Sequence, residues 1–277
     1  MATPGPAQAA EGALLAGLRA VLAGRTLVRP AFAAAPADLL RLAAAQNLIP
    51  WLEVAYRPGE LPTSIAADVQ RECLRRRARQ ALLLGAFEEL EQTLGAAGVR
   101  AMPFKGLAMA HRHYASPTLR YFDDLDILIP AASADAALAV LAEAGYAPHP
   151  RNPRPDWHHL PPQVHRGHHA MVELHLDPAR RFKPGWDVAG VWSRASRARL
   201  GAVETWLMSD ADALVTVALH ARHNLFDRLT YFLDAAVLLT ALRKRPKELA
   251  RARELAAEAG VAAALDHLLA RTHALFP

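Results

Sequence analysis

Two aspartates separated by one residue, Asp124 and Asp126, have the type and spacing that suit a metal site. In an extended strand, side chains two residues apart point to the same face, so these carboxylates would lie together. Leu125, Ile127 and Ile129 would then occupy the other face and pack on the core. Adjacent carboxylates repel each other unless a cation lies between them, and Mg²⁺ is the hard divalent ion that best suits carboxylates together with phosphate oxygens.

A phosphate-binding turn is predicted upstream of this strand. Gly106 lies where a short strand over 99–104 meets a helix over 107–114, and a glycine there lets backbone N–H groups approach a phosphate closely. Lys105 and Arg120 add positive charge nearby. The alternative is an edge strand whose carboxylates are solvated and pair with Lys105 and Arg120. The order of strand, Lys-Gly turn, helix, turn and second strand favours the metal site.

The elements that position these residues follow from hydrophobic periodicity and turn residues. The predicted helices are 11–23, 36–48, 63–97, 107–114, 133–144, 209–223, 229–242, 246–259 and 261–275. The predicted strands are 99–104, 124–129 and 170–176, with edge strand and loop over 146–155, and the predicted N-caps are Thr63, Ser133 and Ser209. The chain therefore divides into a helical region over 1–98, an α/β core over 99–207 and a helical region over 208–277.

Composition narrows the class of protein. Of 277 residues, 52% are hydrophobic and 21% are charged, which excludes a wholly disordered chain. No apolar run approaches the roughly 20 residues that span a bilayer, and no secretory signal is expected, so we expect a cytoplasmic protein without a membrane partner. The single cysteine, Cys73, excludes an internal disulfide and a cysteine-based zinc cluster. The net charge of +5 is small, and the arginine run over 75–79 indicates a solvated helix face rather than a nucleic-acid site.

Three segments together resemble a known family. The string FKGLAMAHRHYASPTLRYFDDLDILIP, the later VELH, and the LHARHN-type helix ahead of YFLDAAVLL are similar to the uncharacterised nucleotidyltransferase family of the polymerase-β-like superfamily. Members carry a Lys-Gly turn, an arginine before an Asp-hydrophobic-Asp strand, and a later acidic-hydrophobic-His strand. The resemblance covers about 99–239 and is most specific over 105–129. It implies an α+β fold, with a small mixed sheet flanked by helices and added helical regions for the second substrate.

The resemblance also implies the chemistry. Asp124, Asp126 and Glu173 would hold two Mg²⁺ ions, and Glu173 would help to remove a proton from the acceptor. The substrate would be an NTP, and a hydroxyl of a small molecule, a peptide or a protein would attack the α-phosphorus while pyrophosphate leaves. Relatives occur beside peptide-tailoring kinases, which favours peptide modification. Nucleotide binding would fall to Lys105, Gly106 and Arg120.

The turn itself motivates an alternative function. It reads Lys105-Gly106-Leu107, where the superfamily's usual turn is Gly-Ser or Gly-Gly. A degenerate fold of this kind would bind a nucleotide or a protein partner for regulation, without catalysis. It would bind NTP and release no pyrophosphate.

Histidines are frequent, with 13 in the chain. Six lie in one segment: His158, His159, His165, His168, His169 and His175. The segment is rich in proline, lacks HExxH and has no fixed period, which favours a polar loop over a zinc site, with a histidine-zinc hydrolase as the remaining alternative. His175 differs because it shares a strand face with Glu173, so it would lie near the carboxylates. It resembles the strand-terminal histidine of the family, which implies a contact with phosphate or acceptor.

His220 and His223 lie three residues apart on one face of a predicted helix, ahead of a helix that carries Asp234. One interpretation is recognition of the acceptor or the base at the mouth of the site. The favoured interpretation is structural, a His–Asp hydrogen bond that ties the two helices together.

Overall fold

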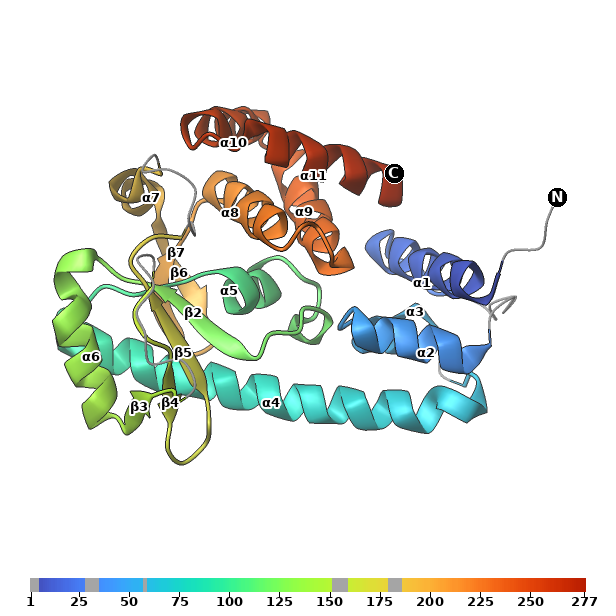
Figure 1. Cartoon of the computed structure of the whole chain (residues 1–277), viewed down its shortest axis with the longest axis horizontal. Helices are drawn as coiled ribbons and strands as arrows, with labels where there is room; N and C mark the ends of the chain where they lie inside the picture. The colour runs from blue at the N-terminus through green and yellow to red at the C-terminus, as the bar shows by residue number, and fades with distance from the viewer. Residues whose placement is uncertain (1–4, 28–34, 57–58, 151–158, 179–185) are drawn as a thin grey trace.

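A long helix and a small sheet form the frame of the protein (Figure 1). The computed structural model describes residues 5–27, 35–56, 59–150, 159–178 and 186–277. Helix α4 (Thr63–Ala96) runs along one side of the molecule, with the sheet over its C-terminal half. The helices nearest the two chain ends lie beside each other, away from the sheet, and form what we call the helical layer. The sheet and the helical layer meet at the centre of the molecule.

Helices make up most of the described chain. Those before the sheet are α1 (Pro6–Leu22), α2 (Pro36–Ala45), α3 (Ile49–Ala55) and α4. Those within and after it are α5 (Lys105–Arg112), α6 (Ala134–Glu143), α7 (Val188–Arg194), α8 (Asp210–His223), α9 (Leu229–Leu242), α10 (Pro246–Glu258) and α11 (Ala262–Leu275). Short 3₁₀ turns cover Pro117–Leu119 and Ala131–Ser133. Among the described residues, no helix combines the length and the apolar character that a membrane crossing requires.

The sheet is mixed. Its strands lie in the order β1-β2-β5-β4-β3, and a separate hairpin pairs β6 with β7. The strands are β1 (Met102–Pro103), β2 (Asp124–Leu128), β3 (Tyr146–Pro148), β4 (Gln163–His165), β5 (Met171–His175), β6 (Ser196–Leu200) and β7 (Val203–Leu207). Strands β2 and β5 are parallel, while the other neighbouring pairs are antiparallel. The small mixed sheet flanked by helices confirms the predicted α+β class.

Strand β2 is internal rather than an edge strand. It pairs with β1 on one side and with β5 on the other. Leu125 and Ile127 on one of its faces are fully buried, as the alternation predicts. They pack with Phe87 of α4 and Leu174 of β5 in the core beneath the sheet. The alternative of a solvated edge strand is therefore wrong for β2.

Helix α4 connects two hydrophobic cores. Val69 in its first half packs in the larger core, which also contains Leu14 of α1 and Leu238 of α9. Leu83 and Phe87 in its second half belong to the core beneath the sheet. The first and last helices of the chain thus bury their apolar faces in one shared core, since an amphipathic helix gains most of its stability from such packing.

Several predicted boundaries differ from the structure. The helix predicted over 36–48 ends at Ala45, and neither α3, which begins at Ile49, nor the hairpin β6–β7 is predicted from the sequence. In β6 the arginines Arg197 and Arg199 are exposed and only Leu200 is fully buried, so the strand lacks the apolar alternation that marks a half-buried strand. Strand β4 has three residues, too few for a periodic signal.

The predicted N-caps are confirmed in part. Ser209 caps α8, because its side chain accepts a hydrogen bond from the backbone N–H of Asp212. Ser133 occupies the N-cap position of α6 without a capping hydrogen bond. Thr63 is not the cap of α4, since Pro62 occupies that position and Thr63 is already helical.

Gly106 is required by packing at the start of α5. A Cβ at this position would lie 2.4 Å from the Cβ of Phe122, closer than real Cβ atoms come. The expected result for Gly106→Ala is a loss of about 1–3 kcal/mol in the free energy of unfolding, measured with urea. Gly85→Ala in α4 is the matched control, because a Cβ there meets nothing within 4 Å. The control should gain about 0.5–1 kcal/mol from helix propensity. An unchanged urea midpoint for Gly106→Ala would contradict this account of the turn.

Candidate active site

The carboxylates of the candidate site lie on one face of two parallel strands. Asp126 of β2 is directly opposite Glu173 of β5 in the register. Asp124 and His175 each lie two residues from one of this pair, so they share its face of the sheet. The pairing of β2 with β5 thus brings together residues that lie far apart in the sequence.

Asp126 is in contact with two other side chains of the candidate site. Its Oδ1 atom lies 2.6 Å from Nζ of Lys105 and 2.8 Å from Nε2 of His175. The same histidine nitrogen lies 3.6 Å from Oε2 of Glu173. Asp126 is 6% exposed and His175 is 1% exposed. Ligand atoms of Asp126, Glu173 and His175 lie within 4.8 Å of one another, close enough for one metal ion.

The predicted metal set and the observed group overlap in two residues. The resemblance implies Asp124, Asp126 and Glu173, whereas the tightest group of potential ligands among the described residues is Asp126, Glu173 and His175. Asp124 lies one step earlier on the same strand face and lines the same pocket. His175, expected near the carboxylates, is in direct contact with Asp126, and its contact with phosphate or acceptor stays a prediction.

The charges in this cluster are not balanced. Burial and the neighbouring carboxylates of Asp126 and Glu173 raise the pKa of Asp124 to about 7. Burial alone would raise the pKa of Asp126 as well, but the Lys105 ammonium and His175 hold it well below its usual range. His175 also lowers the pKa of Glu173, against the effect of burial. A cation beside Asp124 would favour its ionised form by offsetting this repulsion.

An open pocket of about 380 Å³ lies over this face. Its walls come from α5, from the strand face and from the end of α8. The predicted site residues that line it are Lys105, Gly106, Arg120, Asp124, Asp126, Glu173, His175, His220 and His223. Asp234, the remaining predicted residue, lines a smaller cavity behind the pocket.

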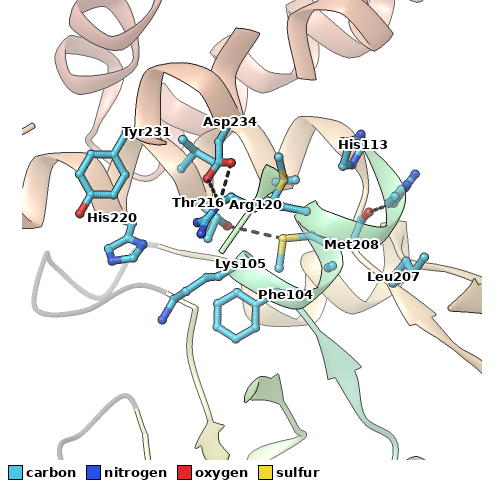
Figure 2. Close-up of a pocket in the computed structure, with 15 residues that line it drawn as sticks. Phe104, Lys105, His113, Arg120, Leu207, Met208, Thr216, His220, Tyr231 and Asp234 are labelled. Atoms are coloured by element: carbon cyan, nitrogen blue, oxygen red, sulfur yellow. Dashed lines mark hydrogen bonds and ion pairs between the residues drawn. The ribbon is translucent and has the colours of Figure 1, made fainter. Parts of the chain in front are cut away.

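Asp234 holds Arg120 in place (Figure 2). Its carboxylate accepts a hydrogen bond of 2.8 Å from Nε of Arg120 and one of 2.6 Å from the hydroxyl of Tyr114. The ring of His220 packs edge-to-face on Tyr231, with centroids 5.3 Å apart. Asp234 thus pairs with Arg120 and Tyr114, so the predicted hydrogen bond from the His220 and His223 pair to this carboxylate is wrong. The physical reason is that a guanidinium forms a stronger, charge-assisted bond to a buried carboxylate than a neutral imidazole does.

The helix that carries His220 and His223 is anchored at its start by buried ion pairs. Asp210 contacts Arg245 and lies 2.9 Å from Nη2 of Arg112. Asp212 accepts two hydrogen bonds of 2.8 and 2.9 Å from Arg194. Both carboxylates are at the N-terminus of α8, where the helix dipole also favours negative charge. These contacts fix the position of α8 over the sheet.

Two further polar residues, Asn224 and His159, line the pocket and are not assigned to the site from the sequence. Asn224 follows His223 directly and ends α8, and its place after the histidine pair is a signal that could have included it. His159 lies beside the strand, with its ring centroid 5.5 Å from that of His175. No sequence spacing indicates this contact, since it depends on an isolated bridge between the two residues.

The remaining histidine cluster does not form a metal group in the part of the chain that the structure describes. His165 and His168 stack on each other with centroids 3.6 Å apart. The potential metal ligands found among the described residues are those around Asp126. His158 lies outside the described residues.

Comparisons with known proteins agree with the resemblance seen in the sequence. The model of the family described as "Uncharacterised nucleotidyltransferase" matches residues 33–277. No curated protein matches the chain.

The solved structures to which this chain is similar have low sequence identity to it. The solution structure of the antibiotic-resistance factor ANT(2'')-Ia is 13% identical, with a TM-score of 0.47, and covers 68% of this chain and 97% of its own. The crystal structure of ANT(2")-Ia in complex with adenylyl-2"-tobramycin is 10% identical, with a TM-score of 0.48, covering 63% and 97%. An antigenic nucleotidyltransferase-like protein from Paracoccidioides brasiliensis is 14% identical, with a TM-score of 0.41, covering 66% and 92%.

His220, which lines the pocket, makes the free energy of unfolding depend on pH. Burial, together with the adjacent Lys105, lowers the pKa of His220 from 6.5 to about 3. Between these pH values the unfolded chain binds a proton that the folded chain does not, so stability is lost as the pH falls below 6.5. His220→Gln should reduce the slope of unfolding free energy against pH by about 1.4 kcal/mol per pH unit between about pH 4 and 6.

Urea titrations at several pH values measure this slope. His273→Gln is the matched control, since His273 is exposed, and it should leave the slope unchanged. A slope that His220→Gln does not alter would mean that the imidazole is protonated in the folded protein.

Proposed function

The chain belongs to the uncharacterised nucleotidyltransferase family, and we propose that it transfers a nucleoside monophosphate from an NTP to a hydroxyl group, with release of pyrophosphate. The acceptor in this proposal is a small molecule, a peptide or a protein. The observation that carries the proposal is the register of Asp126 with Glu173, beside Asp124, on one wall of an open pocket. The opposite wall, with His220 and His223, leaves room for substrates.

The residues on this wall suit divalent metal ions. Carboxylate oxygens are the donors that Mg²⁺ prefers. Burial, with the neighbouring carboxylates of Asp126 and Glu173, raises the pKa of Asp124, and a cation would offset the effect of those carboxylates. We propose that Asp124, Asp126 and Glu173 hold Mg²⁺, with two ions as the superfamily pattern implies. Bound there, the ions would neutralise charge on the triphosphate and stabilise the attacking and leaving oxygens.

The chain's own residues have distinct tasks in the proposed transfer. Helix α5 has no side-chain N-cap, so the first backbone N–H groups of its N-terminal turn, next to Gly106, are available to phosphate oxygens. Lys105 binds the triphosphate as a mobile point charge, while Arg120, held by Asp234, adds a fixed one. The hydroxyl oxygen bonds to the α-phosphorus as the bond to pyrophosphate breaks, and the hydroxyl proton passes to Glu173.

The second substrate has space on the helical side. A polar pocket of about 270 Å³ adjoins the first and shares Arg120, His220 and Asn224 with it. Tyr121 and Tyr231 also line it. In the proposal, His220 and His223 contact the acceptor or the base at the boundary of the two pockets.

One contact favours the alternative function, a catalytically degenerate module that binds a nucleotide or a protein partner for regulation. Lys105 already places a cation 2.6 Å from Oδ1 of Asp126, an oxygen that the catalytic proposal assigns to a metal. If that lysine permanently replaced the metal, the protein would bind nucleotide without a divalent ion and release no pyrophosphate.

A thermal shift experiment distinguishes the two functions. The protein is heated with each of the four NTPs, with and without Mg²⁺. A ligand at 100 times its dissociation constant should stabilise the protein by about 2.7 kcal/mol. The catalytic proposal predicts a shift that requires Mg²⁺ and is lost in Asp126→Asn and Glu173→Gln, because each variant removes a charged metal ligand.

For each variant, the melting temperature with ligand is compared with the melting temperature of the same variant without ligand. This is needed because Asp126→Asn also changes the stability of the protein alone. Asp68→Asn, on the exposed side of α4, is the matched control and should keep the full shift. A shift of equal size without Mg²⁺ would favour the degenerate module. No shift with any NTP would contradict the nucleotide binding that the catalytic proposal requires and would favour the module that binds a protein partner.

A further inference from the structure

Lys105 makes a contact that phosphate binding does not explain. Its Nζ atom lies 2.6 Å from Oδ1 of Asp126, and the side chains of the two residues are only 18% and 8% exposed. Nε2 of His175 lies on the same oxygen at 2.8 Å. A lysine that served only the triphosphate would extend into the pocket rather than against a buried carboxylate.

The backbone conformation at Lys105 also indicates a role for its side chain beyond phosphate binding. Its φ is +51°, a left-handed conformation that costs a residue with a Cβ roughly 1–2 kcal/mol and that glycine adopts freely. Gly106 is the next residue, yet the left-handed position is held by lysine. Strained backbone of this kind persists only where the surrounding structure holds it, and it clusters at active sites and ligand-binding sites. Here the conformation starts α5 and directs the Lys105 side chain away from the Arg120–Asp234 pair (Figure 2).

Lys105 is a cation in direct contact with Asp126, and the other basic groups of the pocket wall do not replace it. Arg120 is committed to Asp234, with its Nε 2.8 Å from that carboxylate. His220, next to Lys105 in the pocket wall, is half-buried, and this burial lowers its pKa and keeps it neutral. Lys105, with the ring nitrogen of His175 on the same oxygen, therefore occupies the place that a metal would otherwise take.

A metal and this ammonium cannot share the oxygen without strong repulsion. Mg²⁺ lies about 2.1 Å from a carboxylate oxygen, so an ion on Oδ1 would lie no more than about 4.7 Å from Nζ of Lys105. At that distance a divalent ion and an ammonium repel each other strongly in a partly buried site. Lysine has a flexible stem of four carbons and can leave without moving the helix.

We propose that Lys105 is a displaceable counter-ion of the metal site, which keeps divalent ions out until a triphosphate draws the ammonium away. Metal and nucleotide then bind together, and neither binds tightly alone. This inference rests on the proposed function, because it assigns Asp126 to the metal. It also explains how a lysine can contact the metal-site carboxylate in an active enzyme.

Mn²⁺ binding by equilibrium dialysis tests the inference without any turnover. The wild-type protein should bind Mn²⁺ weakly by itself and much more tightly when inorganic tripolyphosphate is present. Lys105→Met should bind Mn²⁺ alone about 10-fold more tightly than the wild type, a coupling of ordinary size between two sites. In the variant, tripolyphosphate should add less to Mn²⁺ binding, since the ammonium that it draws away is gone.

Three variants serve as controls. Lys105→Arg keeps the charge and should bind Mn²⁺ as weakly as the wild type. Lys244→Met makes the same substitution at an exposed lysine in the loop before α10 and should change nothing. If Lys105→Met does not fold, Lys105→Gln replaces it, because glutamine keeps a hydrogen-bond donor for Asp126 and removes the charge.

The outcomes separate this inference from the proposed function. Equal Mn²⁺ affinity of the wild type and Lys105→Met in the absence of tripolyphosphate would overturn the counter-ion role. If tripolyphosphate still promoted Mn²⁺ binding, the proposed function would stand. No Mn²⁺ binding by any variant, with or without tripolyphosphate, would overturn both.

Discussion

Three carboxylates on one face of two parallel strands repel one another, and much of the surrounding structure balances that charge. Asp126 and Glu173 face each other across the strand pair β2–β5, and Asp124 lies one step away. Lys105 and His175 hold the most buried of the three, Asp126, in its ionised form. Asp124 has no comparable partner among the described residues, and burial together with the neighbouring carboxylates raises its pKa to about 7. A site arranged in this way favours the arrival of further positive charge.

The helical layer determines the shape of the space above these carboxylates. Helices from both ends of the chain share one core, and α8 emerges from it with His220 and His223 at its end. The pair of Arg120 and Asp234 links the turn before β2 to α9, so it joins the sheet to the helical layer beside the pocket. In the proposed function, nucleotide phosphates lie against the sheet and the acceptor lies against the helices.

The sequence predicts the parts of the site that depend on local periodicity. A period of two places Asp124 with Asp126, and Glu173 with His175, each pair on one face of its own strand. The pairing of β2 with β5 could be predicted only from the family resemblance, because it joins segments that lie far apart in the sequence. The contact of Lys105 with Asp126 appeared only within the edge-strand alternative, which the internal position of β2 contradicts.

The helices were predicted well where apolar spacing is regular. The range of α9, Leu229–Leu242, agrees with the prediction, whereas the arginine-bearing β6 was missed. In the proposed function, a divalent ion and an NTP occupy the pocket together. A crystal structure with Mn²⁺ and a non-hydrolysable NTP analogue, with the metal located by anomalous scattering, tests this joint binding. Mn²⁺ is expected beside Asp126 and Glu173, with Lys105 moved onto the phosphates. Analogue bound without Mn²⁺, with Lys105 still on Asp126, would contradict it.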